Sequence, residues 1–189
     1  MRLALFGGTF DPIHNAHLAV ARDAADHFLL DQVLLIPNSI PPHKMRQATA
    51  SYADRLAMVE LAAQADPRFR ASRLEESAGK SYSIQTVERV RQQAGPADEI
   101  FFLIGADAFS EIETWYRWQE LVRHVEFIVL SRPGYHYDIP AGARVHRLET
   151  LNLDVSSTSI RQQLAAGATP PELPPAVLAY IRRNALYSG

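Results

Sequence analysis

The chain has 189 residues, which is the size of one domain, and 47% of them are hydrophobic, enough to form a buried core. Its formal net charge of −2 excludes a general electrostatic attraction to nucleic acid or to an anionic membrane, so any phosphate chemistry depends on local groups. Because the sequence contains no cysteine, disulfides, cysteine zinc sites and a thiol nucleophile are also excluded.

Short apolar runs alternate along the chain with stretches in which apolar residues recur every three or four positions, a pattern that predicts strands and amphipathic helices. In chain order, we expect a strand at residues 3–6, a helix at 18–28, a strand at 33–36, a helix at 56–63, a strand at 69–74, a helix at 84–90, strands at 100–104, 127–130 and 145–148, and helices at 160–165 and 177–181. Residues 37–51, which contain three prolines, are expected to form a loop. Continuous apolar strands of this kind are typical of a parallel sheet with helices on both faces, so the predicted fold class is α/β.

The apolar segments are all too short to place the protein in a membrane. None approaches the roughly 18 residues that a transmembrane helix needs. The first of them is interrupted by Gly7, Gly8 and Asp11 before the hydrophobic part of a signal peptide could form. We therefore expect a cytoplasmic protein with one domain over residues 1–189 and a small C-terminal helical extension.

The first strand leads into the segment GGTFDPIHNAHL at residues 7–18, at a strand end where parallel sheets bind their ligands. Its two glycines have no Cβ and allow the backbone to approach a ligand closely. His14 and His17 are three residues apart at the start of the expected helix, so both rings lie on one side of its first turn. Together with the free N–H groups and the positive dipole end of that turn, two imidazoles are suited to bind the phosphate oxygens of a triphosphate.

Two other interpretations of this histidine pair stay open on the residues alone. A bare H-x-x-H pattern is most often two ordinary helix residues. A metal site is the second alternative, but no third ligand lies at a useful spacing, so we expect no metal held by protein side chains. The position of the pair directly after a Gly-Gly turn at the end of the first strand favours a function.

Polar groups also follow the second strand and the strand at 100–104. Lys44, in the loop after the second strand, carries a flexible point charge suited to β- and γ-phosphates, although a solvated loop lysine is the simpler interpretation. Gly105 permits close approach of a ligand to its strand end. Asp107 either accepts hydrogen bonds from ribose hydroxyls or caps the next helix.

Two further groups lie later in the chain. The segment SSTSIR at residues 156–161 combines four hydroxyl side chains with Arg161 at the start of a helix, which suits a phosphate but also ordinary helix capping. Trp115, Tyr116 and Trp118 form an aromatic cluster in which a Trp either stacks on a flat ring or serves packing alone.

Taken together and in order, these segments resemble the nucleotidyltransferase superfamily that is defined by a His-x-Gly-His motif, and more closely the bacterial nicotinate-nucleotide adenylyltransferases. The similar segments extend over nearly the whole chain: GGTFDPIHNAHL, PNSIPPHK, SYADRLAMVELA with Arg55, SYSIQTV, FLIGADAF, WYRW, SRPG, SSTSIR and PPAVLAYI. The resemblance implies a Rossmann-like doubly wound parallel sheet. It also implies transfer of AMP from ATP to nicotinate mononucleotide, which gives nicotinate adenine dinucleotide and pyrophosphate in NAD biosynthesis.

The resemblance further implies roles for particular residues. The expected catalytic residues are His14, His17, Lys44 and Arg161. ATP is expected to contact the first motif, two strand ends and the start of a late helix, at Gly7, Gly8, Thr9, Phe10, His14, His17, Lys44, Gly105, Asp107, Ser156, Ser157, Thr158 and Arg161. Nicotinate mononucleotide is expected to contact Thr86, Gly105, Asp107, Trp115 and Tyr116, with Trp115 stacked on the pyridine ring.

Two positions depart from the family pattern. Ala16 stands where the motif has glycine, which puts the closest backbone approach at that point in question. Gln85 stands where an Asp often precedes the threonine, which affects a local hydrogen bond and the shape of the nicotinate pocket.

The implied chemistry needs no general base, because the attacking group is a phosphate monoester with a second pKa of about 6 and is largely dianionic at neutral pH. Catalysis then consists of positioning and of charge neutralisation on the α-phosphate and the pyrophosphate leaving group. Mg²⁺ is expected to arrive as Mg-ATP, held by phosphate oxygens and water. The expected partners are the two small-molecule substrates, with no nucleic acid and no membrane, and a homo-oligomer stays open.

Three rival functions stay open at this stage. A sister enzyme would use another acceptor, such as nicotinamide mononucleotide, phosphopantetheine or a sugar phosphate, although Trp115 and the segment SYSIQTV favour a pyridine mononucleotide. A class I aminoacyl-tRNA synthetase uses a related histidine motif, but this chain is short, is not basic and has no evident anticodon-binding region. A nucleotide sensor would bind ATP without releasing pyrophosphate.

Overall fold

The computed structural model describes residues 1–39, 48–76, 82–150 and 155–188. Its centre is a six-stranded sheet in the order β3-β2-β1-β4-β5-β6, in which every neighbouring pair is parallel. The strands are β1 (Arg2–Gly8), β2 (Gln32–Pro37), β3 (Phe69–Ala71), β4 (Glu99–Gly105), β5 (Glu126–Ser131) and β6 (Arg144–Glu149). The helices are α1 (Asn15–His27), α2 (Tyr52–Ala63), α3 (Ser83–Gln93), α4 (Ala106–Ser110), α5 (Trp118–His124), α6 (Ser157–Ala165), α7 (Pro175–Arg183) and the short 3-10 helix η1 (Ile112–Thr114). Among the described residues, no helix is long and apolar enough to cross a membrane. The predicted doubly wound parallel α/β sheet is confirmed.

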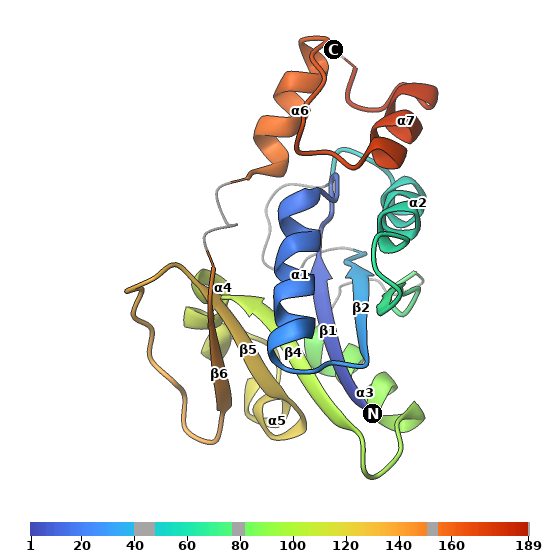
Figure 1. The fold of residues 1–189 in the computed structure, drawn as a ribbon. Coiled ribbons are helices and arrows are strands. Elements are labelled where there is room, and N and C mark those ends of the chain that lie inside the picture. Colours follow the sequence, from blue (N-terminus) through green and yellow to red (C-terminus); the bar gives the residue numbers. More distant parts are fainter. Residues whose placement is uncertain (40–47, 77–81, 151–154, 189) are drawn as a thin grey trace.

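Helices cover both faces of the sheet because both faces of its strands are apolar. Along β1, Ala4 and Phe6 pack into one core, which also contains buried residues of α1, α2, α6 and α7. Leu3 and Leu5 point the other way, into a second core with residues of α3, α4 and α5. Figure 1 shows α1 lying across the front of the sheet. The strand order reverses between β1 and β4, which is the point where doubly wound sheets bind their ligands.

The C-terminal part of the chain lies at the carboxyl end of β1. Figure 1 shows α6 and α7 beyond that end of the sheet, opposite to the N-terminus. Helix α7 packs against α2, where the hydroxyl of Tyr180 donates to Oδ1 of Asp54 at 3.0 Å. Val177, Ile181 and Tyr187 are buried in the same core as α1. The helical extension is therefore part of the main hydrophobic core.

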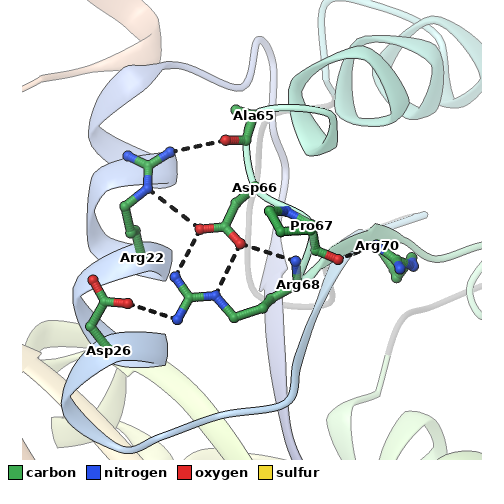
Figure 2. Close-up of polar contacts among 7 residues, drawn as sticks. All are labelled: Arg22, Asp26, Ala65, Asp66, Pro67, Arg68 and Arg70. Atoms are coloured by element: carbon green, nitrogen blue, oxygen red, sulfur yellow. Dashed lines mark hydrogen bonds and ion pairs between the residues drawn. The ribbon is translucent and has the colours of Figure 1, made fainter.

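An ion-pair cluster fastens α1 to the edge of the sheet, as Figure 2 shows. Asp66, in the turn before β3, lies 2.8 Å from Nη2 of Arg68 and 3.5 Å from Nε of Arg22 on α1. Nη1 of Arg68 also lies 2.7 Å from Asp26 on the same helix. The hydrogen bonds from Arg68 lower the pKa of Asp66 to about 2, so this carboxylate stays charged at neutral pH. The cluster fixes the helix that begins at the histidine motif.

Most predicted elements extend one to four residues further at an end in the structure, and two places differ in kind. β3 ends at Ala71 rather than at residue 74, because the chain turns there and buries Glu75 instead of continuing along the sheet edge. The segment between β4 and β5 contains α4, η1 and α5, which are too short to show helical periodicity in the sequence. Helix α1 begins at Asn15, in agreement with a helix that starts at the histidine pair, and His14 is its N-cap.

Candidate active site

A cavity of about 350 Å³ opens at the carboxyl ends of β1 and β4, where the strand order reverses. Six predicted site residues line it, namely Gly7, Gly8, Thr9, Gly105, Trp115 and Tyr116. Its other walls include the apolar side chains Phe6, Phe102, Leu103 and Ile104 and the polar residues Asn38, Glu75, Tyr82 and Ser83. A largely apolar cavity of this size with a few convergent polar groups suits a small-molecule ligand.

A second cavity, of about 110 Å³, contains the histidine motif. Its lining includes His14, Ala16 and His17 together with Phe6, which also lines the larger cavity. The two spaces are therefore neighbours. Because Ala16 lines the smaller space, its departure from the family pattern adds a methyl group to the candidate ligand site.

His14 and His17 form a stacked pair at the start of α1. Their ring centroids are 3.7 Å apart with an interplanar angle of 26°. The backbone N–H of His14 donates to Nδ1 of His17 at 3.2 Å. Because Nδ1 of His17 accepts this bond, the proton of its neutral ring is placed on Nε2. His17 therefore presents an Nε2–H donor, and the predicted position of both rings on one side of the first turn is confirmed.

The His14 ring is almost fully buried, with 3% of the residue exposed. Among the described residues, none gives Nδ1 of His14 a hydrogen-bond partner. Burial lowers the pKa of His14 to about 4, because the imidazolium would lose its hydration. His14 is thus neutral at pH 7 until an anion comes close, since a nearby negative charge favours the protonated form.

The buried His14 is expected to make folding depend on pH between its ordinary pKa of 6.5 and about 4. In this window the unfolded chain binds a proton that the folded chain does not, so the free energy of unfolding falls as the pH falls. His14→Asn is expected to flatten this dependence, whereas His27→Asn, at an exposed position of α1, keeps it. Denaturant titrations at several pH values measure the slope, and equal slopes in all three proteins would contradict the burial argument.

Phe10 supports the histidine pair from the core side. Its ring lies 5.1 Å from that of His17 and 5.7 Å from that of Phe6, edge-on in both cases, and the residue is 2% exposed. The backbone of Phe10 has a φ of +48°, an uncommon conformation for a residue with a side chain. A Cβ at Gly8 would lie 2.9 Å from this ring. The predicted contact of Phe10 with ATP is therefore restricted to the backbone, because the side chain belongs to the core.

Two side chains of α6 are fastened to the turn that precedes the histidine motif. Arg161 donates from Nη1 to the carbonyl oxygen of Asp11 at 2.7 Å and from Nη2 to Oγ1 of Thr158 at 3.3 Å. Ser157 donates its hydroxyl to the carbonyl oxygen of Pro12 at 3.1 Å. The structure thus brings together the first and the last of the segments that contain predicted site residues, GGTFDPIHNAHL and SSTSIR.

Ser156 does not act as an ordinary helix cap. It occupies the N-cap position of α6, but its side chain makes no capping hydrogen bond. The first turn of a helix presents backbone N–H groups and the positive end of the dipole, which suits a phosphate. Capping alone therefore does not account for the hydroxyl-rich start of α6.

Arg55 is a buried cation beside the glycine turn, and its position is not evident from periodicity. The residue is 2% exposed and donates from Nη1 to the carbonyl oxygen of Thr9 at 2.7 Å and from Nη2 to that of Ser39 at 3.5 Å. Burial lowers its pKa, while the carboxylates of Asp11 and Glu75 oppose this change. In the sequence, Arg55 is marked by its place in the family-like segment SYADRLAMVELA and by being a single Arg on an otherwise apolar helix face.

Thr86 and Asp107 are not among the residues that line the larger cavity. Thr86 is 4% exposed and donates its hydroxyl to Oε1 of Glu75 at 2.7 Å. Glu75 does line the cavity and lies 3.4 Å from the backbone nitrogen of Ser39. Asp107 is exposed and accepts a hydrogen bond from the hydroxyl of Tyr135 at 2.9 Å. The direct substrate contacts of Thr86 and Asp107 stay predictions, and Glu75 is a polar wall residue that the motifs do not reveal.

Trp115 and Tyr116 form one wall of the larger cavity. Trp115 is half-buried and meets the ring of Phe102 edge-on at 6.3 Å. The Tyr116 ring lies 4.7 Å from that of Tyr82. The next residue, Arg117, has a φ of +55° and is held by ion pairs to glutamates on α3 and α5. This arrangement fixes the aromatic wall against which a flat ring could stack.

Lys44 lies outside the described residues, so its contact with phosphate stays a prediction. Within the described ranges, no group of three His, Asp or Glu side chains is placed to hold a metal ion. Among the described residues, Arg161 and Arg55 bind the backbone of the turn at residues 9–14, the histidine turn, through the carbonyl oxygens of Asp11 and Thr9.

Comparison with known proteins gives three further findings. The sequence model of the family described as cytidylyltransferase-like matches residues 5–163. A "Probable nicotinate-nucleotide adenylyltransferase" of Solibacter usitatus is 55% identical over 188 residues, which cover 100% of both chains. The "Nicotinate-nucleotide adenylyltransferase" of Bacillus subtilis is 36% identical over 190 residues, which cover 100% of this chain and 99% of that one. The fold matches the solved structure of Plasmodium falciparum nicotinic acid mononucleotide adenylyltransferase complexed with NaAD, with a TM-score of 0.79, 18% identity, and coverage of 98% of this chain and 97% of that chain.

Proposed function

The chain belongs to the cytidylyltransferase-like family and, within it, to the nicotinate-nucleotide adenylyltransferases, and on this premise we propose how its site works. It is an enzyme that transfers AMP from ATP to nicotinate mononucleotide and releases pyrophosphate. The product is nicotinate adenine dinucleotide, an intermediate of NAD biosynthesis. The observation that carries the proposed mechanism is the stacked pair of His14 and His17, which lies beside a cavity suited to a mononucleotide.

In this reaction an oxygen of the nicotinate mononucleotide phosphate attacks the α-phosphorus of ATP. A new P–O bond forms while the bond from the α-phosphorus to the α,β-bridging oxygen breaks, and pyrophosphate leaves with that oxygen. The attacking phosphate has a second pKa of about 6, so it is largely dianionic at pH 7 and needs no general base. The protein contributes by positioning both substrates and by stabilising negative charge in the transition state.

We assign the triphosphate to the histidine turn and the start of α6. His17 donates from Nε2 to a phosphate oxygen, and the ring of His14, which stacks on His17 and lines the same small cavity, is assigned to the same phosphates. Arg161, together with the first N–H groups of α6, neutralises charge on the phosphates. Lys44, in the chain after β2, is a further proposed cation for the β- and γ-phosphates.

The larger cavity takes the acceptor nucleotide. Trp115 stacks on the pyridine ring, and Gly8 and Gly105 let the backbone approach the ligand closely. Tyr82 and Ser83 place the start of α3 in the same wall. Backbone N–H groups of this helix start are suited to bind the nicotinate carboxylate.

Mg²⁺ enters as part of the substrate Mg-ATP and is held by phosphate oxygens and water. We further propose that the enzyme works in the cytoplasm on free nucleotides. Its net charge of −2 supports a function without nucleic acid or a membrane surface.

Pyrophosphate release with Mg-ATP tests the acceptor assignment. The value of kcat/KM for nicotinate mononucleotide is expected to exceed that for nicotinamide mononucleotide by at least about tenfold, because N–H donors bind a carboxylate more strongly than a neutral amide. Trp115→Ala is expected to lower kcat/KM for the acceptor by about tenfold through lost stacking, with a change of less than about twofold in KM for ATP.

Two other outcomes would contradict parts of this assignment. Equal use of both acceptors would leave adenylyl transfer in place but contradict the recognition of the carboxylate. ATP binding without pyrophosphate release in the presence of either acceptor would contradict the enzyme assignment and favour a nucleotide sensor.

A further inference from the structure

The carboxylate of Asp11 is a buried junction in the turn between β1 and α1. Asp11 is 4% exposed. Its Oδ2 accepts a hydrogen bond from the backbone nitrogen of Thr49 at 2.7 Å, and its Oδ1 accepts one from that of Ala50 at 3.0 Å. The hydroxyl of Tyr187 donates to the same Oδ1 at 2.7 Å. One carboxylate therefore joins the histidine turn, the chain that leads into α2 and the C-terminal segment after α7.

Tyr187 is held firmly as the donor of this pair. The residue is 9% exposed and has a φ of +58°, so its backbone occupies the left-handed region. Burial and the hydrogen bond to Asp11 raise its pKa well above the ordinary value, and the hydroxyl stays protonated at any pH used for assay.

The same turn also carries Arg161, one of the proposed phosphate ligands. Nη1 of Arg161 binds the carbonyl oxygen of Asp11 at 2.7 Å and lies 3.8 Å from Oδ2 of its carboxylate. Because this carbonyl oxygen holds the guanidinium group, a displacement of Asp11 also displaces the side chain of Arg161. His14 follows only three residues later, at the N-cap of α1.

We propose that Asp11 and Tyr187 are positioning residues for adenylyl transfer, which hold the turn that places Arg161 and His14 against the triphosphate. This inference rests on the proposed function of the site. Neither side chain is required to touch a substrate. The C-terminal segment thereby sets the geometry of the phosphate site at the other end of the sequence.

The chain contains a second hydrogen bond from a tyrosine hydroxyl to an aspartate, and this one lies between α7 and α2. The hydroxyl of Tyr180 on α7 donates to Oδ1 of Asp54 on α2 at 3.0 Å. Asp54 also accepts a hydrogen bond from Ser51, and Arg183 stacks on the Tyr180 ring, so this pair belongs to the packing of α7 on α2. Both tyrosines lie close to the C-terminal end of the sequence and both donate a hydrogen bond to an aspartate. Only the aspartate bound by Tyr187 belongs to the histidine turn.

The test compares Tyr187→Phe with Tyr180→Phe, each of which removes one hydroxyl and keeps the ring. Initial rates of pyrophosphate release are measured with both substrates varied, at a temperature at which circular dichroism shows every variant to be folded. Tyr187→Phe is expected to lower kcat/KM for ATP by about tenfold, because small misplacements of catalytic groups are costly. The KM for nicotinate mononucleotide, which binds in the other cavity, is expected to change by less than about twofold. Tyr180→Phe is expected to keep both parameters within about twofold of the wild type.

The double mutant with Asp11→Asn gives a second measurement. If the two residues act as one unit, the combined loss in kcat/KM is smaller than the product of the two single losses. Equal kinetics in Tyr187→Phe and the wild type would overturn the inference, as would equal losses in the two Phe variants or equal effects on both substrates. A wild-type protein without activity would instead overturn the proposed function and, with it, this inference.

Discussion

Replacing His14 or His17 with alanine is expected to lower kcat by about 10²–10³-fold, because each ring supplies a preorganised donor to the phosphates in a partly buried site. His17 presents Nε2–H, since its Nδ1 accepts the backbone N–H of His14. His14 is buried and neutral, so it gains a favourable charge interaction only when the triphosphate is close. The two rings stabilise the reacting phosphates, so removing either ring is expected to lower kcat.

Both variants are expected to stay folded. His14→Ala leaves a cavity, but it also removes a buried nitrogen without a partner, so the two effects offset each other in part. We expect the free energy of unfolding to change by less than about 2 kcal/mol in either variant. His27→Ala, at an exposed position on the same helix, is the matched control and should keep wild-type kcat. Near wild-type turnover in His14→Ala or His17→Ala would remove these residues from the mechanism.

Gly8→Ala is expected to lower the free energy of unfolding by about 1–3 kcal/mol, as overpacking of a well-packed core does. The new methyl group would lie 2.9 Å from two atoms of the Phe10 ring. That ring cannot move away freely, because it is 2% exposed and is enclosed by Phe6 and His17. The displaced Phe10 ring is therefore expected to shift the His17 ring, which it contacts, and kcat is expected to fall by about tenfold or more.

Gly7→Ala is the matched control for this steric argument. Among the described residues, a Cβ at Gly7 meets only Oδ1 of Asn38, at the ordinary contact distance of 3.5 Å. Its stability is expected to stay within about 0.5 kcal/mol of the wild type in urea titrations. Adding Phe10→Leu to Gly8→Ala should restore part of the lost stability by making room for the methyl group. Equal losses in the two glycine variants, or no recovery in the double mutant, would show that the Phe10 ring is not the cause.

The parts of the fold and site that depend on local pattern could be predicted from the sequence. Four of the six strands, β1, β2, β4 and β5, are apolar runs, and the parallel sheet follows from their alternation with helices. The positions of His14 and His17 on one side of a helical turn follow from their spacing of three. Their stacking, and the bond from the His14 backbone to Nδ1 of His17, could not be predicted, because both depend on His14 being the N-cap rather than a helical residue.

The buried charged residues could not be placed from the sequence. Asp11, Arg55 and Glu75 belong to residue types that are usually exposed, and each is buried only because its partners come from distant segments. Asp11 needs Tyr187, 176 residues away, and Arg55 needs the carbonyl oxygen of Thr9, 46 residues away. No local pattern encodes such pairings, and they decide which residues support the catalytic groups.

The distance between Asp11 and Tyr187 along the chain has a consequence for biosynthesis. At the usual rate of synthesis, about 5–20 residues per second, the ribosome adds Tyr187 roughly 10–35 s after Asp11. Once β6 has been made, the nascent polypeptide contains the histidine motif and all six strands, but the histidine turn still lacks the hydrogen bond from Tyr187. Translation that stalls before codon 187 therefore yields a polypeptide that contains the histidine motif but lacks one of the donors that hold the histidine turn. On the proposed role of Tyr187, the enzyme reaches its full rate of ATP consumption only after this residue has been added.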